Sequence, residues 1–331
     1  MRKRTLGKNG PVVGALGLGA MGMTSGAYGV SDRAESIATV HAALDAGVTL
    51  IDTSDHYGSG LNEMLLAEAL RGRPRDGYQL SVKFGALTGP GGGVNGQDNR
   101  PVAVKNFLIH SMNRLGVDHI DIYRPARLDP AVPIEETVGA IKEMIDAGYV
   151  RHVGLSEVDA ETIRRAHAVH PIADLQIEYS LISRAVEDEV LPTLRELGIG
   201  LTAYGVLSRG LISGHWNPAA EAPGDHRGRM PRFQGANAEH NLALVEALRR
   251  IAEAKGCTVA QLAIAWVAER GVDIVPVVGA RTRKRLSEAL PALDLELTAD
   301  DLARIDLAVP RGAARGDRYP SAFMSGLGVG N

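Results

Sequence analysis

Short apolar segments alternate with amphipathic segments eight times along this chain, and this alternation restricts the possible folds more than any other feature. The apolar segments are brief and β-prone, as buried strands are. The connections between them are long enough for the crossover that joins two parallel strands, which takes a dozen or more residues. The predicted strands are residues 15–18, 50–52, 79–83, 120–123, 152–156, 174–178, 200–204 and 274–278.

The amphipathic segments place apolar residues three and four positions apart, which predicts helices. Eight strand–helix units are the number at which a parallel sheet closes, so we predict an α/β fold of the (β/α)8 TIM barrel type with extra helices. An open, doubly wound sheet is the alternative, since periodicity does not distinguish the two. The predicted helices are residues 31–46, 62–70, 102–115, 134–147, 160–168, 190–197, 241–255, 258–269, 283–290 and 299–307.

Three segments lie outside this alternation in the single domain predicted for residues 1–331. Residues 1–14 have glycines and a proline between β-prone pieces, which indicates an N-terminal β-hairpin. Residues 205–237 are rich in Gly, Pro and Arg with little apolar period, and so long a connection is usually a functional loop. Residues 311–331 are glycine-rich and predict a C-terminal surface arm.

Composition narrows the class of protein. Hydrophobic residues make up 45% of the chain and the formal net charge is −3, without long runs of one sign. We therefore expect no nucleic-acid surface and no basic membrane patch. Cys257 is the only cysteine, so no intrachain disulfide forms. The basic start of the chain lacks a following apolar segment, and no stretch is long enough to span a membrane, so we expect a cytoplasmic protein.

Gly17, Gly19 and Gly22 match the dinucleotide pattern G-x-G-x-x-G, with Asp52 as the acidic partner expected on the ribose. In that fold the glycines open directly into a helix whose N-terminus binds the pyrophosphate. Here a further loop intervenes, and the helix cannot begin before about Ser31. We therefore favour a loop after the first strand over the open dinucleotide fold.

Asp52 and Lys83 each end a predicted strand, and Tyr57 follows Asp52 by five residues. In a βα-barrel the carboxyl ends of the strands converge on one mouth. A lysine ammonium next to Tyr57 would lower the pKa of its phenol, while burial would raise it. The three residues thus suit proton transfer, with Tyr57 as a general acid toward a carbonyl oxygen. Two alternatives stay open: ordinary loop residues, or a Lys83 nucleophile that forms a Schiff base.

Four motifs of the chain resemble those of the aldo-keto reductases. They are residues 52–58 (DTSDHYG), 83–85 (KFG), 129–136 (DPAVPIEE) and 154–157 (GLSE). The resemblance extends from about residue 6 to residue 307. It implies a (β/α)8 barrel that binds NAD(P)H at its mouth and reduces a small-molecule carbonyl substrate by hydride transfer. It also implies that Asp52, Tyr57 and Lys83 are three of the four catalytic residues of the family. No metal site is predicted.

The same resemblance implies which residues bind the cofactor. Ser156 and Gln176 match those that bind the nicotinamide carboxamide, and Tyr204 matches the aromatic residue that stacks on its ring. Arg281 and Arg285 suit a ribose 2′-phosphate, because guanidinium groups bind phosphate in a bidentate manner, and this favours NADPH. The remaining residues implied to bind cofactor are Gly19, Met21, Arg209, Gly210, Gly279 and Glu288.

One catalytic position departs from the family pattern. The segment after the fourth strand has Ala126 directly before Arg127, where the family commonly has a histidine that hydrogen-bonds the substrate carbonyl. Removing one such donor typically costs about 10²–10³ in rate. Arg127, His56 or a water molecule are the candidate replacements. The rival hypothesis is a cofactor-binding regulatory protein of the same fold with little catalysis. The identity of the carbonyl substrate and the oligomeric state are not predicted.

Overall fold

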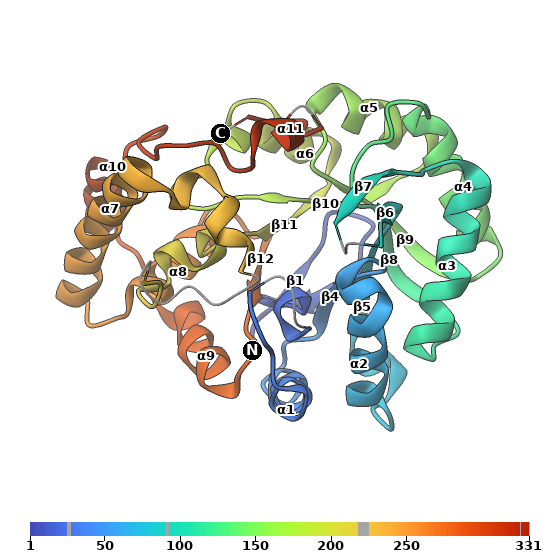
Figure 1. The fold of residues 1–331 in the computed structure, drawn as a ribbon, viewed down its shortest axis with the longest axis horizontal. Helices are drawn as coiled ribbons and strands as arrows, with labels where there is room; N and C mark the ends of the chain where they lie inside the picture. Colours follow the sequence, from blue (N-terminus) through green and yellow to red (C-terminus); the bar gives the residue numbers. More distant parts are fainter. Residues whose placement is uncertain (25–27, 91–92, 218–224, 325, 331) are drawn as a thin grey trace.

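Eight parallel strands close into a barrel at the centre of the molecule (Figure 1). The computed structural model describes residues 1–24, 28–90, 93–217, 225–324 and 326–330. The strands run in sequence order around the barrel, so each one pairs with its neighbours along the chain and the last pairs with the first. This confirms the predicted (β/α)8 barrel and excludes the open sheet. The barrel strands are β3 (Gly17–Gly19), β4 (Leu50–Ser54), β5 (Gln79–Phe84), β8 (Ile120–Pro125), β9 (Val150–Ser156), β10 (Ile172–Glu178), β11 (Gly200–Tyr204) and β12 (Ile274–Gly279).

Helices surround the barrel and cover its outer face (Figure 1). Two further helices, α7 and α8, lie between β11 and β12 as predicted. Within the described residues, no single helix is long and apolar enough to cross a membrane, although α7 and α8, bent by 88°, pass that test together. The helices are α1 (Arg33–Asp45), α2 (Leu61–Leu70), α3 (Pro101–Leu115), α4 (Ile134–Asp146), α5 (Ala160–Val169), α6 (Val190–Leu197), α7 (Gly235–Ala254), α8 (Val259–Ala268), α9 (Arg283–Ala289), α10 (Ala299–Ala308) and α11 (Ser321–Met324).

The N-terminal hairpin is present, with β1 (Lys3–Thr5) antiparallel to β2 (Val12–Gly14). Several boundaries differ from the prediction by one or two residues, and the start of α7 differs by more. The first barrel strand begins at Gly17 rather than at residue 15, and α7 begins at Gly235 rather than at residue 241. Polar residues such as Asn237 and His240 interrupt the apolar period of the first turns of α7, and this is why periodicity placed its start too late.

The predicted loops contain more regular structure than their composition suggests. A small antiparallel hairpin, β6 (Ala86–Thr88) and β7 (Val94–Gln97), follows β5. Short 3-10 helices lie within the predicted long loop, at Ser208–Ser213, His226–Arg229 and Pro231–Phe233. Residues 218–224 of that loop, and residues 325 and 331 of the C-terminal arm, lie outside the described part of the chain.

The interior of the barrel contains a buried arginine. Arg124 of β8 donates from Nη1 to Oδ2 of Asp174 at 3.0 Å and from Nη2 to Oγ of Ser81 at 2.9 Å. The guanidinium fits because Gly154 of β9 has no side chain: a Cβ atom there would lie 3.1 Å from Cζ of Arg124 and 2.9 Å from Cγ2 of Ile122. Buried charges are tolerated where they are paired and hydrogen-bonded, as here.

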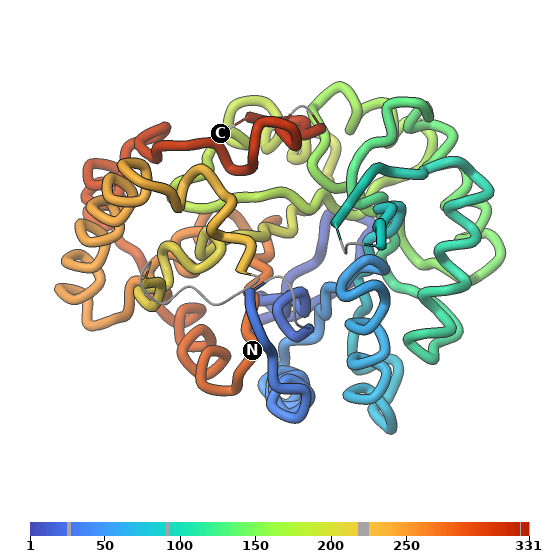
Figure 2. Tube along the Cα trace, in the orientation of Figure 1, coloured from blue at the N-terminus to red at the C-terminus, as the bar shows by residue number. Residues whose placement is uncertain are grey.

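The C-terminal arm crosses one end of the barrel (red in Figure 2), and most of its described residues are exposed or half-buried. Arg318 is 2% exposed and donates from Nη2 to Oε2 of Glu157, which directly follows β9. The prediction of a surface arm is therefore wrong for this residue. Glycines at 312 and 316, both with positive φ, let the arm turn back onto the barrel.

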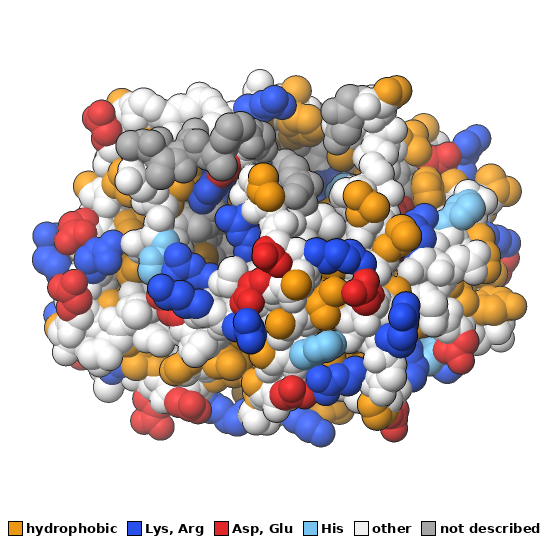
Figure 3. Space-filling model, turned by 60° about the horizontal axis from the view of Figure 1, so that its bottom comes forward, with side chains coloured by type: hydrophobic (Ala, Val, Ile, Leu, Met, Phe, Trp, Pro, Cys, Tyr) orange, Lys and Arg blue, Asp and Glu red, His pale blue; other side chains and the backbone are white. Residues whose placement is uncertain are grey.

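Charged side chains of both signs are interspersed on the face seen in Figure 3. That face shows no broad area of a single sign, in line with the small net charge of −3.

Candidate active site

Asp52 and Lys83 form an ion pair at the carboxyl ends of the adjacent strands β4 and β5. Nζ of Lys83 lies 2.6 Å from Oδ2 of Asp52, and each side chain is 6% exposed. The other carboxylate oxygen, Oδ1, accepts hydrogen bonds from Oγ of Ser81 at 2.9 Å and from Nε2 of Gln176 at 2.8 Å. The carboxylate is therefore fully hydrogen-bonded, and it fixes the position of the ammonium group.

Tyr57 lies beside this pair. Nζ of Lys83 is 5.1 Å from the centroid of the Tyr57 ring. The chain brings the tyrosine back to the mouth through a tight turn in which Gly58, Ser59 and Gly60 all have positive φ. Among the described residues, no group hydrogen-bonds the Tyr57 hydroxyl. A proton donor held in place by its ring but with a free hydroxyl is suited to meet a substrate atom.

Burial shifts the pKa values of both groups. Burial, and then the negative charge of Asp52, raise the pKa of Tyr57 well above its usual value near 10, although Arg127 opposes the shift. Burial likewise lowers the pKa of Lys83, against the attraction of Asp52. The sequence left open whether the ammonium or burial controls the tyrosine pKa. In the structure burial prevails, so Tyr57 keeps its proton at neutral pH.

Ala126 follows β8 at the same end of the barrel and is 3% exposed. Its backbone N–H donates to the carbonyl oxygen of Phe84 at 2.7 Å, which ties this turn to β5. The next residue, Arg127, donates from Nη1 to the carbonyl oxygen of Ala126 at 2.6 Å and from Nη2 to Oη of Tyr319 at 3.3 Å. The side chain of Arg127 is thus folded back over the turn that contains Ala126.

His56, the other side chain considered as a replacement donor, has one of its two ring nitrogens engaged. Its Nδ1 lies 2.7 Å from Oγ of Ser54. Its ring packs edge-on against the ring of Tyr57, with 4.8 Å between centroids. His56 therefore helps to position Tyr57 from the loop side.

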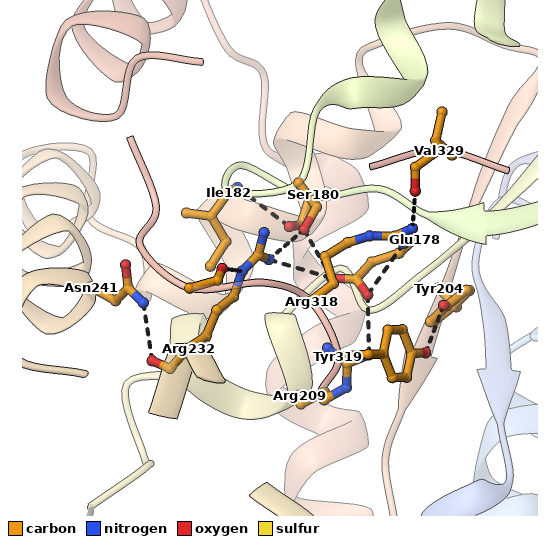
Figure 4. Close-up of polar contacts among 12 residues, drawn as sticks. Glu178, Ser180, Ile182, Tyr204, Arg209, Arg232, Asn241, Arg318, Tyr319 and Val329 are labelled. Atoms are coloured by element: carbon orange, nitrogen blue, oxygen red, sulfur yellow. Dashed lines mark hydrogen bonds and ion pairs between the residues drawn. The ribbon is translucent and has the colours of Figure 1, made fainter. Parts of the chain in front are cut away.

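A cluster of charged side chains adjoins the site (Figure 4). Arg209, Arg232 and Arg318 all point toward Glu178 at the end of β10, at 3.2, 3.6 and 3.6 Å. Burial would raise the pKa of Glu178, but the three arginines outweigh it and lower that pKa. No local sequence pattern marks this cluster, because its members come from β10, the long loop and the C-terminal arm.

Strained backbone occurs at this end of the barrel. Glu157, Ser208 and Arg209 have φ values of 54°, 46° and 54°, which side-chain-bearing residues rarely adopt. Such outliers cluster at functional sites, where the surrounding structure holds them in place. Their location indicates that the loops after β9 and β11 are shaped for a task other than stability.

The residues implied to bind a nicotinamide differ in whether their polar groups already have hydrogen-bond partners within the protein. Oγ of Ser156 is buried and has no partner among the described residues, and the same is true of Oγ of Ser208, which the sequence did not single out. Gln176, in contrast, donates its amide to Asp52. Tyr204 donates its hydroxyl to Oε1 of Glu157 at 2.7 Å, which leaves its ring fixed at the mouth.

The glycines implied to contact the cofactor lie at the rim. Gly19 and Gly279 end the paired strands β3 and β12, and a Cβ atom at Gly279 would meet nothing within 4 Å. Met21 lies in the short helix after β3. Gly210 has a φ of 93°, which completes the turn begun by Arg209. The rim is therefore open at Gly279, whereas a Cβ atom at Gly19 would lie 3.4 Å from Cγ1 of Val277 and one at Gly210 would lie 3.2 Å from Nη1 of Arg227.

The arginines proposed for a ribose phosphate are engaged within the chain. Nη1 of Arg281 donates to the carbonyl oxygen of Tyr28 at 2.7 Å, and Arg285 pairs with Glu288 at 3.1 Å. Positive charge at the start of α9 opposes the helix dipole, and a nearby anion relieves it. Glu35 of α1 already supplies one, since its Oε1 accepts the backbone N–H of Arg283 at 2.8 Å. The positive charge at the start of α9 therefore does not by itself require a bound phosphate.

Comparison with known proteins agrees with this geometry. The model of the aldo/keto reductase family matches residues 15–309, so the chain belongs to this family of oxidoreductases. The structure is similar to that of the glycerol dehydrogenase of Gluconobacter oxydans, at 27% identity and a TM-score of 0.83 over 92% of this chain and 94% of that one. It also shares its fold with a thermostable aldo-keto reductase solved with the inhibitor epalrestat, at 24% identity, a TM-score of 0.73, and coverage of 93% and 100%.

Proposed function

We propose that the protein is an NADPH-dependent reductase that converts an aldehyde or ketone to an alcohol, with Tyr57 as the general acid. The observation that carries this proposal is the buried Lys83–Asp52 pair, 2.6 Å apart, beside a tyrosine whose hydroxyl has no partner among the described residues. Such a pair is costly to bury, and a structural role alone gives no reason to place it at the barrel mouth.

The residues at the mouth fit a nicotinamide cofactor. Ser156 and Ser208 have buried hydroxyls without partners, which is unusual unless a ligand completes them. Ser156 would hold the carboxamide, Tyr204 would pack against the ring, and Arg209 with Gly210 would adjoin the phosphates. Arg281 and Arg285 would bind a 2′-phosphate once Arg285 leaves Glu288. When bound, the reduced nicotinamide supplies a hydride for the carbonyl carbon.

The chain's own residues would handle the proton. Tyr57 is protonated at neutral pH because burial raises its pKa, so it is in the correct form to donate to the carbonyl oxygen. Lys83 would stabilise the phenolate that remains, and Asp52 would keep the ammonium charged and oriented. Gln176 and Ser81 hold Asp52 in turn. Alcohol oxidation is the reverse, with the Tyr57 phenolate as the base.

The test is NADPH oxidation with a panel of aldehydes, ketones and sugars, with NADH in parallel. The name of the Gluconobacter relative makes glyceraldehyde and glycerol the first pair to try. Tyr57→Phe should remove turnover and leave NADPH binding within about twofold of the parent. A parent that binds NADPH but turns over no member of the panel would favour the regulatory hypothesis. A Tyr57→Phe variant as active as the parent would contradict the proposed mechanism.

A further inference from the structure

The site has no side chain at position 126 to bind the substrate carbonyl. The methyl group of Ala126 carries no donor, and Ala126 is buried where the family pattern leads one to expect a histidine. Hydride addition places negative charge on the carbonyl oxygen, and a donor aimed at that charge is worth about 10²–10³ in rate. A replacement donor must lie at this end of the barrel and have N–H groups that no other residue uses.

Arg127 is such a donor. Each of the other three arginines at the mouth, Arg209, Arg232 and Arg318, pairs with Glu178 or Glu157. Arg127 makes no ion pair with any residue in the described part of the chain. A guanidinium has about five N–H donors, and its two recorded hydrogen bonds go to neutral oxygens, which leaves donors available to a ligand.

The C-terminal arm holds Arg127 in place through hydroxyl groups. Tyr204 gives its proton to Glu157, so in the 2.9 Å contact between the two phenol oxygens Tyr319 must be the donor to Tyr204. Oη of Tyr319 is thereby left as the acceptor for Nη2 of Arg127. The hydrogen bonds of this series therefore run in one direction: Arg127 donates to Tyr319, Tyr319 to Tyr204, and Tyr204 to the carboxylate of Glu157.

Two further contacts fix the tyrosine itself. The guanidinium of Arg209 lies 4.4 Å from the centroid of the Tyr319 ring. The preceding residue, Arg318, is anchored on both oxygens of Glu157, at 3.1 and 2.9 Å. The buried salt bridge between Arg318 and Glu157 thus holds Tyr319 in place. Tyr319 in turn orients Arg127, which lies far from the arm in the sequence.

Electrostatics agrees with this placement. Burial by itself would lower the pKa of Arg127, but Tyr319, Tyr204 and Glu157 raise it, so the guanidinium stays charged. Arg127 also lowers the pKa of Tyr57, the proposed acid. A permanent positive charge near Tyr57 favours both the developing alkoxide and the phenolate that follows.

We propose that Arg127, oriented by Tyr319 of the C-terminal arm, is a catalytic residue that binds the substrate carbonyl oxygen in place of the missing donor at position 126. This inference rests on the proposed reductase function. The carbonyl carbon gains a hydride from the dihydronicotinamide, which is oxidised, and the C=O π electrons move to the oxygen. That oxygen takes the proton of Tyr57, and Arg127 donates hydrogen bonds throughout without losing a proton.

The experiment compares Arg127→Ala with the parent, using glyceraldehyde or 4-nitrobenzaldehyde, whichever the parent reduces faster. We expect kcat to fall by about 10²–10³, while the Kd for NADPH, measured by fluorescence titration, stays within about twofold. Guanidinium chloride at low, non-denaturing concentration should restore part of the lost rate to Arg127→Ala and none to Tyr57→Phe. Arg311→Ala, which removes an exposed arm arginine paired with Asp188, is the matched control and should behave as the parent.

Two variants keep the inference testable if Arg127→Ala folds poorly. Tyr319→Phe retains the ring but not the hydroxyl that accepts from Arg127, and we expect a loss of about tenfold in kcat with little change in KM. The double variant Ala126→His with Arg127→Lys restores a donor at position 126 and should exceed Arg127→Lys alone. Equal activity of these two, or a kcat for Tyr319→Phe equal to that of the parent, would count against the inference.

The outcomes separate this inference from the proposed function. If Tyr57→Phe is inactive and Arg127→Ala keeps the kcat of the parent, Arg127 does not bind the carbonyl, and the reductase proposal stands. If the parent reduces no carbonyl compound, both fail together. If Arg127→Ala loses kcat but is not rescued by guanidinium, its role is structural and the inference is overturned.

Discussion

Lys83 and Asp52 form a buried ion pair across two neighbouring barrel strands, with 2.6 Å between Nζ and Oδ2. Ser81 links this pair to the interior, because it donates to Asp52 and accepts from Arg124. The Lys83–Asp52 pair at the mouth and the charged interior of the barrel therefore form one connected network.

Removing one member of the Lys83–Asp52 pair should destabilise the fold. Lys83→Met leaves the Asp52 carboxylate buried without its cation, and breaking a buried pair in this way costs about 3–5 kcal/mol. Lys105→Met is the control, because Lys105 and Glu143 form an exposed pair worth about 1 kcal/mol or less. Urea denaturation measures both. The double variant Lys83→Met with Asp52→Asn should recover part of the loss. Equal stability of Lys83→Met and the parent would show that the pair is not buried as described.

The raised pKa of Tyr57 predicts opposite pH dependence for the two directions of reaction. Reduction uses the protonated phenol. Because Tyr57 stays protonated between about pH 6 and pH 9, kcat/KM for an aldehyde should not fall over this range through loss of the proton donor. Oxidation uses the phenolate, which is scarce below the raised pKa, so its kcat/KM should rise with pH throughout this range. Initial rates in both directions measure this. A fall in the rate of reduction with a midpoint near pH 7 would mean that burial does not control the pKa of Tyr57.

Arg285 is expected to distinguish NADPH from NADH. Arg285→Leu should weaken NADPH binding by roughly tenfold or more, since a hydrogen bond to a charged group is worth about 1.5–3 kcal/mol. NADH lacks the 2′-phosphate, so its Kd should not change. Arg283→Leu serves as the control, because Arg283 is exposed and pairs with Glu35. Fluorescence titration with each cofactor supplies the comparison. An equal loss for both cofactors would place Arg285 elsewhere than at the phosphate.

Gly154 is predicted to be intolerant of a side chain. In Gly154→Ala the new Cβ would lie 2.9 Å from Cγ2 of Ile122 and 3.1 Å from Cζ of Arg124. Overpacking of this kind costs about 1–3 kcal/mol, measured as a shift of the denaturation midpoint. Gly139→Ala, in α4, meets nothing within 4 Å and should instead stabilise by about 0.5–1 kcal/mol. Identical shifts for the two variants would contradict the packing described around Arg124.

The sequence by itself determined the alternation of eight strands with helices, and this count favoured a closed parallel barrel. The open sheet was excluded only by the structure, in which the last strand, β12, pairs with the first, β3. Asp52, Tyr57 and Lys83 could be singled out for the same reason, because strand ends in such a barrel meet at one mouth. Local pattern did not place every helix start: α1 begins at Arg33, after its cap Asp32, which accepts from the backbone of Glu35, rather than at residue 31. Several short polar residues in a row can each serve as a cap.

Only the tertiary structure decided how the site is completed. Arg318 and Tyr319 lie in a glycine-rich arm with no apolar period, yet they reach Glu157 and Arg127, which precede them by 161 and 192 residues. Two features of the site depend on distances between elements that no local pattern encodes. One is whether burial or charge controls the pKa of Tyr57, and the other is that Arg281 donates to Tyr28 while Glu35 pairs with Arg283. Propensity and periodicity act over a few residues, whereas burial and charge pairing depend on what the closed barrel brings together. The sequence therefore fixes where the mouth is, and the folded chain decides which side chains face one another across it.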